Sequence, residues 1–121
     1  MRYMCLIYFD PQKVFDDSPE SNALLASVGP HDRELSASGR LVSSEALTLP
    51  KDAMTVSVRD GKMSATDGPF LETKEVLAGF LLIEARDLNE AVQIAGGIPF
   101  AKVGHVEVRP VVDFSQPRPK L

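Results

Sequence analysis

The sequence predicts an α+β fold, and three observations lead to this prediction. Strand-like and helix-like segments follow one another in the order strand, helix, strand, strand, hairpin return, strand, helix, strand. An Asp60-Gly61 pair between two alternating segments is a strong hairpin signal. The segments at residues 2–9 and 79–85 are apolar at nearly every position, which is typical of strands that are buried on both faces.

The composition limits the classes of protein to which the chain can belong. With 121 residues, the chain is long enough for one domain with a hydrophobic core. The net charge of -4 excludes non-specific nucleic-acid binding, which needs a basic surface. No apolar run reaches the roughly 20 residues that span a bilayer, and the N-terminus does not resemble a signal peptide. The single cysteine, Cys5, excludes an internal disulfide, and we expect a cytoplasmic protein without a cofactor.

The first strand and the first helix are predicted from local signals. Residues 2–9 form the strand, and residues 10–18 form a polar loop with a short helical turn near Val14. Ser18 is a suitable N-cap because Pro19 occupies the first helical position after it. Pro30 either kinks the helix or begins a second helix after Gly29.

The remaining elements follow from alternation and turn residues. Asp87 and Glu90 form a capping box for a second helix that ends at residues 96–97, and Pro99 begins a short connector. The further strands are expected at residues 41–49, 54–59, 62–66, 79–85 and 105–112.

Without its extra hairpin strand, this order is the ferredoxin-like, or split βαβ, plan. Two helices cover only one face of such a sheet. Because two strands are apolar on both faces, we expect a homodimer whose sheets pack face to face as an α+β barrel. Residues 1–114 are expected to form the domain, and the Pro-rich residues 115–121 a flexible tail.

His31 is the strongest single candidate for a functional residue. It shares a helical stripe with Leu24, Val28 and Leu35, so it is expected to face the sheet, where an inward histidine can act as a general base. The alternative is a structural histidine bonded to a carbonyl or a water. The neighbouring Asp32 is expected to be solvated. No pair of histidines has the spacing of metal ligands, so no metal site is predicted.

Four further residues are candidates for contact with a substrate or with His31. Ser44 and Glu45 lie in an unusually polar strand, which fits either a ligand cleft under the first helix or an edge strand facing water. Asp67 can cap the turn that follows it, orient His31 or hold a ligand. Lys74 can bind a carboxylate or a phosphate, although a solvated lysine is the simpler interpretation.

Several motifs together resemble the DGPF-domain group of the YCII-related proteins. They are the opening strand Met4–Tyr8, DGPF at residues 67–70, ETKE at 72–75, GF at 79–80 and VEVRPV at 106–111. The resemblance covers residues 1 to about 114, and it implies a dimeric ferredoxin-like α+β barrel.

The resemblance also implies a histidine in the first helix and an aspartate before a Pro-aromatic pair. His31 matches the histidine, but Ile98 precedes Pro99-Phe100, so Asp67 is considered as a replacement for the acid. Relatives of this group include a dehydrochlorinase that acts on a chlorinated muconate-type acid, and muconolactone isomerases have a similar architecture. Group members are often encoded beside extracytoplasmic-function sigma factors.

Two functions therefore remain open. In the first, the homodimer binds a small anionic organic molecule under the first helix and carries out lyase- or isomerase-type proton transfer. His31 is then the base, Asp67 orients it, and Ser44, Glu45 or Lys74 binds the substrate. In the second, the chain is a non-catalytic regulatory module that binds a partner such as a sigma factor.

Overall fold

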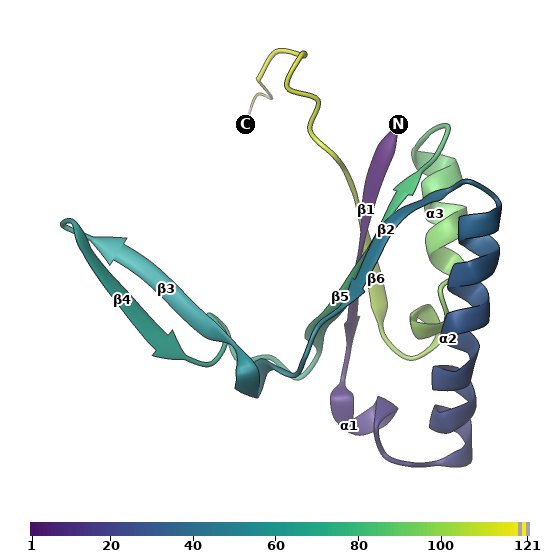
Figure 1. Ribbon diagram of the computed structural model, residues 1–121, viewed down its shortest axis with the longest axis horizontal. Helices are drawn as coiled ribbons and strands as arrows, with labels where there is room; N and C mark the ends of the chain where they lie inside the picture. The colour runs from purple at the N-terminus through teal and green to yellow at the C-terminus, as the bar shows by residue number, and fades with distance from the viewer. Residues whose placement is uncertain (119, 121) are drawn as a thin grey trace.

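The computed structural model describes residues 1–118 and 120, and it shows a four-stranded antiparallel sheet with helices on one face (Figure 1). The strand order β2-β5-β1-β6 is that of the split βαβ plan, which confirms the α+β prediction. The bounds of these strands are Arg2–Phe9 for β1, Leu41–Ala46 for β2, Val76–Glu84 for β5 and His105–Pro110 for β6.

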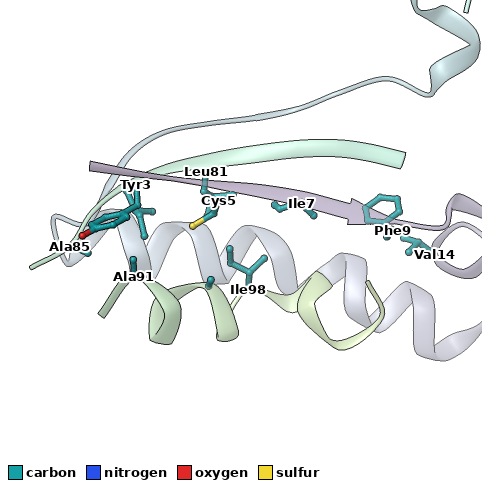
Figure 2. Close-up of a cluster of buried hydrophobic side chains, with 11 residues drawn as sticks. Tyr3, Cys5, Ile7, Phe9, Val14, Leu81, Ala85, Ala91 and Ile98 are labelled. Atoms are coloured by element: carbon teal, nitrogen blue, oxygen red, sulfur yellow. The ribbon is translucent and has the colours of Figure 1, made fainter. Parts of the chain in front are cut away.

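Strand β1 is at the centre of the sheet and supplies much of the core. Its alternate residues Tyr3, Cys5, Ile7 and Phe9 are buried and face the helices (Figure 2). Ala91 and Ala95 of helix α3 pack against this cluster, and such small side chains allow a helix to lie close to a sheet. The other buried members of the cluster are Val14, Leu81, Ile83, Ala85 and Ile98.

The opposite face of the sheet is apolar but only partly buried. It carries Met4, Leu6 and Tyr8 of β1, which lie opposite Leu82, Phe80 and Leu77 of β5. Both faces of β1 were predicted to be buried. Within the described part of the protomer, helices cover only one of them.

Helix α2 runs without interruption from Pro19 to Ala37. The Ser18 hydroxyl accepts a hydrogen bond from the Ser21 N–H at 3.1 Å, as predicted for the N-cap. The helix passes through Pro30, so the interpretation that a second helix begins there is wrong. A shorter helix, α1 at Pro11–Val14, lies in the loop that precedes α2.

The hairpin does not join the main sheet as an extra strand. Strands β3 (Met54–Arg59) and β4 (Lys62–Asp67) form a separate two-stranded sheet that projects from the body (Figure 1). Asp60 and Gly61 have φ values of 51° and 73°, the left-handed conformation of the predicted tight turn. One face of the hairpin is apolar and exposed, with Met54, Val56, Val58 and Met63 each more than half accessible to solvent.

Three predicted strand boundaries differ from the structure by two or more residues. Strand β2 ends at Ala46 rather than at residue 49, and a short 3-10 helix, η1, covers Pro50–Asp52. Strand β5 begins at Val76 rather than at residue 79, after the loop that follows Gly68. Strand β6 ends at Pro110 rather than at residue 112, although the Val111 N–H still bonds the Arg2 carbonyl at 3.0 Å. The tail prediction for residues 115–121 includes residues 119 and 121, which lie outside the described residues.

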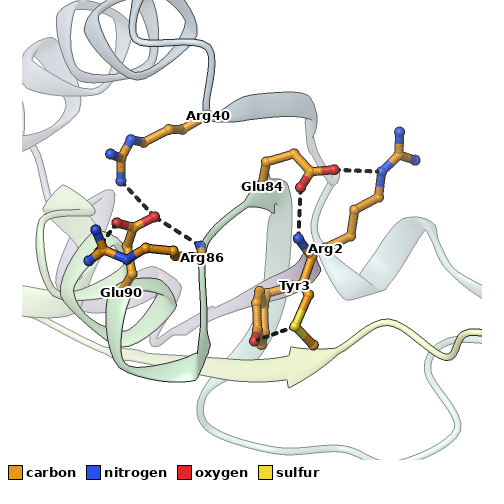
Figure 3. Close-up of polar contacts among 7 residues, drawn as sticks. Arg2, Tyr3, Arg40, Glu84, Arg86 and Glu90 are labelled. Atoms are coloured by element: carbon orange, nitrogen blue, oxygen red, sulfur yellow. Dashed lines mark hydrogen bonds and ion pairs between the residues drawn. The ribbon is translucent and has the colours of Figure 1, made fainter.

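A small ionic network stabilises the N-terminal end of helix α3 (Figure 3). Helix α3 covers Leu88–Gly96, and a 3-10 helix, η2, follows at Pro99–Lys102. The Asp87 carboxylate accepts from the Glu90 N–H at 2.9 Å, as predicted, but the Glu90 carboxylate accepts from the Arg86 N–H at 3.0 Å and not from the cap residue. Glu90 also pairs with the Arg40 guanidinium at 2.9 Å. The Arg86 N–H, followed by Arg40, lowers the pKa of Glu90 below its ordinary value of 4.5.

No helix among the described residues is long and apolar enough to cross a membrane.

Replacement of Gly104 by alanine should destabilise the fold. An added Cβ would clash with the carbonyl oxygen of Tyr8, a backbone atom that cannot move aside without disturbing β1. Overpacking of this kind costs about 1–3 kcal/mol, or more where the backbone must shift. Urea unfolding measures this loss. Gly96→Ala is the matched control, because its Cβ would meet no atom within 4 Å and its site is helical. Equal stability of Gly104→Ala and wild type would contradict the close approach.

The Glu90 network should contribute stability that acid removes. Because the folded-state pKa of Glu90 is lowered, its contribution is present above pH 4.5 and is lost as the pH falls through the folded-state value. Unfolding midpoints measured from pH 7 to pH 3 should fall less steeply for Glu90→Gln than for wild type. Arg40→Gln, which removes the partner and keeps the carboxyl group, should also give a shallower curve. Parallel curves for all three proteins would refute this role.

Candidate functional site

A cavity of about 620 Å³ lies between helix α2 and the helix-facing side of the sheet. Ile7 and Phe9 of β1 and Leu81 of β5 form part of its floor, and Leu25 and Val28 of α2 form part of its wall. Most of the lining side chains are apolar, so polar groups that reach the cavity would fix the orientation of a ligand.

Asp32 is the polar residue of α2 that lines this cavity. It follows Leu25 and Val28 at intervals of seven and four residues, so it continues the line of inward side chains. Its side chain is 30% exposed. The expectation that Asp32 is solvated was therefore wrong. The signal that was missed in the sequence is the spacing of Asp32 from Leu25 and Val28. This spacing places Asp32 on the inner face of the helix, together with Leu35.

His31 lies beside the cavity residues but does not line the cavity. Its Nδ1 is 2.9 Å from Oδ1 of Asp32, and its side chain is 20% exposed. Because a carboxylate only accepts hydrogen bonds, the ring must donate from Nδ1. His31 was expected to face the sheet, but its side-chain hydrogen bond is with the adjacent Asp32, and it is Asp32 that reaches the cavity.

The two polar residues predicted in the second strand lie on different faces. Ser44 is opposite Leu81, on the helix-facing side, and it lines the cavity. Glu45 is opposite Phe80, so its side chain belongs to the face away from the helices, although the residue also borders the cavity. Of the two interpretations of this polar strand, the ligand cleft under the first helix requires a polar residue that lines a cavity. Ser44 meets this requirement.

Asp67 and Lys74 are not brought to His31 within the protomer. Asp67 is the last residue of β4, in the hairpin that projects away from α2 (Figure 1). The adjacent Gly68 takes a φ of 96°, and its N–H bonds the Ala53 carbonyl at 2.8 Å. Lys74 is exposed in the loop before β5. The carboxylate that contacts His31 is that of Asp32.

The buried thiol of Cys5 has no chemical role that its surroundings favour. Burial raises the pKa of Cys5 to about 11, so the reactive thiolate is scarce near neutral pH. Among the described residues, no cluster of three or more histidine, cysteine, aspartate or glutamate side chains is arranged to hold a metal ion.

The charge of the cavity indicates the kind of ligand that it can accept. Its acidic lining residues are Asp32 and Glu45, and no lysine or arginine is among its described lining residues. An anionic ligand, as expected from the sequence, would meet the Asp32 carboxylate without a compensating cation. A neutral molecule with a hydroxyl group fits better, because the carboxylate can accept its hydrogen bond.

Comparison with known proteins gives one family and one curated relative. The YCII-related domain matches residues 1–115. An uncharacterized protein of Rhizobium meliloti (strain 1021) is 32% identical over 114 residues, which cover 92% of each chain.

The fold is also similar to a solved structure. This is 5-chloro-2-hydroxyhydroquinone dehydrochlorinase (TftG) from Burkholderia phenoliruptrix AC1100, in complex with 2,5-dihydroxybenzoquinone. The match has a TM-score of 0.55 at 15% identity and covers 93% of this chain and 94% of that chain. The substrate named for that dehydrochlorinase is a chlorinated hydroquinone and not the muconate-type acid expected from the resemblance. At this identity the likeness shows the fold alone.

Proposed function

The chain belongs to the YCII-related domain family, and we propose that it is a cytoplasmic homodimer that binds a small hydroxylated organic molecule in the cavity under α2. The observation that carries this proposal is the Asp32 carboxylate, which reaches the largely apolar cavity from α2 and bonds His31. A few polar groups among apolar walls are typical of small-molecule sites.

In this proposal the roles of the two residues are the reverse of those expected from the sequence. The Asp32 carboxylate faces the ligand and accepts a hydrogen bond, or a proton in a lyase- or isomerase-type reaction. His31 is a positioning residue, because its Nδ1–H holds Oδ1 of Asp32 and leaves the other carboxylate oxygen for the ligand. The Ser44 hydroxyl, which lines the same cavity from β2, donates or accepts a second hydrogen bond in this proposal.

The similar dehydrochlorinase supports the size and shape of the proposed ligand and not its charge. That structure is a complex with 2,5-dihydroxybenzoquinone, a flat ring whose hydroxyl groups are acidic, as in a vinylogous carboxylic acid. A ring of this size fits easily into about 620 Å³. The two proteins are alike in fold alone. The ligand proposed for this chain therefore rests on the properties of its own cavity.

The homodimer is proposed from two unpartnered apolar surfaces. One is the sheet face of Met4, Leu6 and Leu82, and the other is the apolar side of the β3–β4 hairpin. A two-stranded hairpin is at best marginally stable alone, so its apolar side needs a partner surface. A second copy related by two-fold symmetry offers both surfaces at once.

Asp32→Asn should weaken ligand binding without loss of the fold. Hydroquinone is the probe, and 1,4-dimethoxybenzene is the matched compound that cannot donate a hydrogen bond. We expect hydroquinone to raise the melting temperature of wild type, because a ligand at a hundredfold excess over its Kd stabilises the folded state by about 2.7 kcal/mol. Loss of one charge-assisted hydrogen bond should weaken binding about tenfold in Asp32→Asn. The methylated compound should bind both proteins equally weakly.

Two His31 variants separate a positioning role from a purely structural one. The side-chain amide of His31→Asn can donate from nearly the same place as Nδ1, whereas His31→Ala cannot. Hydroquinone binding should survive in His31→Asn and fall in His31→Ala. If both variants bind like wild type and His31→Ala only melts earlier, His31 is structural and the proposed site loses its support.

Sedimentation at micromolar concentration tests the dimer. We expect a species of twice the 13.2 kDa chain mass. Leu6→Lys on the open sheet face and Val56→Lys on the hairpin should each give monomers, because a charge buried in an apolar interface is costly. Val92→Lys, at an exposed position of α3, is the control and should remain dimeric. A monomeric wild type would refute the dimer and favour the alternative from the sequence, in which the apolar surfaces bind a different protein such as a sigma factor.

A further inference from the structure

The cavity under α2 is larger than a ligand of one ring needs. Its volume is about 620 Å³, whereas an engineered cavity of about 150 Å³ is enough to hold benzene. A ring whose hydroxyl group bonds Asp32 would therefore leave much of the cavity unfilled. The side chains that line the remaining part indicate which further group a ligand carries.

The cavity is long in the direction of the strands. Ser44 of β2 lies opposite Leu81 of β5, which in turn lies opposite Cys5 of β1, so Ser44 marks the level of Cys5. Phe9, which lines the cavity, follows Cys5 by four residues, and four residues of an antiparallel strand extend about 13 Å. Figure 2 shows this separation along β1. The lining thus extends over more than the length of one benzene ring with its hydroxyl group.

Asp32 lies at the same end of the cavity as Ser44. Helix α2 starts beside α1, because the Ser21 hydroxyl donates to the Lys13 carbonyl at 3.0 Å, and α1 directly follows the Phe9 end of β1. From there α2 runs back along the sheet (Figure 1), and Asp32 comes eleven residues after Ser21, about 16 Å along the helix axis. We call this end, with Asp32 and Ser44, the polar end of the cavity.

Three phenylalanines form the opposite end, which we call the aromatic end. Phe9, Phe15 and Phe100 all line the cavity. The Phe9 ring meets Phe15 edge to face, with centroids 5.7 Å apart and planes at 77°, and its centroid is 4.8 Å from that of Phe100. Phe9 is only 4% exposed, but Phe15 is 54% exposed, so its ring is open to a further partner. Aromatic rings prefer such edge-to-face and offset contacts with another aromatic ring.

Local structure holds Phe15 in this place although its ring is exposed. Phe15 is the C-cap residue of α1, and its N–H bonds the Pro11 carbonyl at 2.8 Å. The preceding Val14 is fully buried and fixes the short helix to the core. Phe9 and Val14 belong to the buried cluster on the helix side of the sheet. The aromatic end is therefore not on the sheet face that the proposed homodimer covers.

We propose that the ligand of this cavity is an elongated molecule, with a hydroxylated ring at the polar end and a second aromatic ring at the aromatic end. The proposal rests on the function proposed above, because it takes the hydrogen bond to Asp32 as given. Phe15 contacts the second ring of the ligand and is the specificity-determining residue. Its contact distinguishes an aromatic ring from a saturated ring of about the same size.

Two probes with the same phenol group isolate the contact with Phe15. They are 4-phenylphenol and 4-cyclohexylphenol, whose second rings are aromatic and saturated, and phenol is the probe without a second ring. Phe15→Leu removes the aromatic ring and keeps an apolar side chain. Phe114→Leu is the matched control, because Phe114 is 94% exposed and is not among the lining residues.

Nuclear magnetic resonance of methyl groups in the full chain shows which end each probe occupies. Leu81 reports on the polar end, because it lies opposite Ser44, and Val76 reports on the aromatic end, because it lies opposite Phe9. Phenol should shift the Leu81 signals and leave those of Val76 unchanged, whereas 4-phenylphenol should shift both. Burial of the second ring should tighten binding about tenfold or more relative to phenol.

The affinities of the variants, measured by isothermal titration calorimetry, test the role of Phe15. Phe15→Leu should weaken binding of 4-phenylphenol about two- to tenfold more than binding of 4-cyclohexylphenol, which is the range for one aromatic contact. Phe114→Leu should leave the affinities for both probes unchanged. Asp32→Asn should weaken binding of all three phenols about tenfold.

Equal losses for the two probes in Phe15→Leu would overturn the proposal, and so would 4-phenylphenol that binds no tighter than phenol or leaves Val76 unshifted. If phenol still shifts Leu81 and depends on Asp32 in those cases, the proposed function stands without the elongated ligand. Binding of phenol to Asp32→Asn that equals binding to wild type would instead refute the proposed function, and this inference with it.

Discussion

The structure depends on the burial of one face of β1. Tyr3, Cys5, Ile7 and Phe9 fill the space between the sheet and the helices, and no other element contributes as many buried residues. Strand β1 also pairs with both β5 and β6, so the register of the sheet and the position of the core are set together. A slip of one residue would turn Met4, Leu6 and Tyr8 toward the helices, and side chains of different shape would replace the present core. Strand β1 therefore also determines the position of the floor of the cavity under α2.

The same constraint explains the character of the candidate site. Ile7 and Phe9 form part of the floor of the cavity under α2. Polar side chains are few in this cavity, so the position of each one decides how a ligand can be oriented. Asp32 can stand there because His31 supplies a donor from the adjacent position. Tyr8 belongs to the opposite face of the sheet with Met4 and Leu6, so alternation along β1 separates the cavity under α2 from the open apolar face.

Local signals in the sequence were sufficient for the fold and insufficient for the site. Ser18, Asp60-Gly61 and Asp87 act within a few residues, so caps and turns could be predicted from the sequence. The end of β2 depends on the Leu47 N–H bonding the Ala78 carbonyl, a contact between distant segments. The partner of His31 was sought at Asp67, although the adjacent residue supplies it. The placement of Asp32 could be read from its spacing to Leu25 and Val28, but a charged residue was assumed to face water.

The projecting hairpin connects the fold to the proposed assembly. Its strands contact each other far more than they contact the rest of the protomer, yet one side is apolar at four positions. An exposed apolar surface of this kind is a cost in water unless another surface covers it. The bond from Thr55 Oγ1 to the Gly68 carbonyl, at 2.8 Å, fixes the base of the hairpin to the corner at Gly68. Any partner that held the hairpin would therefore also fix the position of this corner, because the bond from Thr55 joins the two.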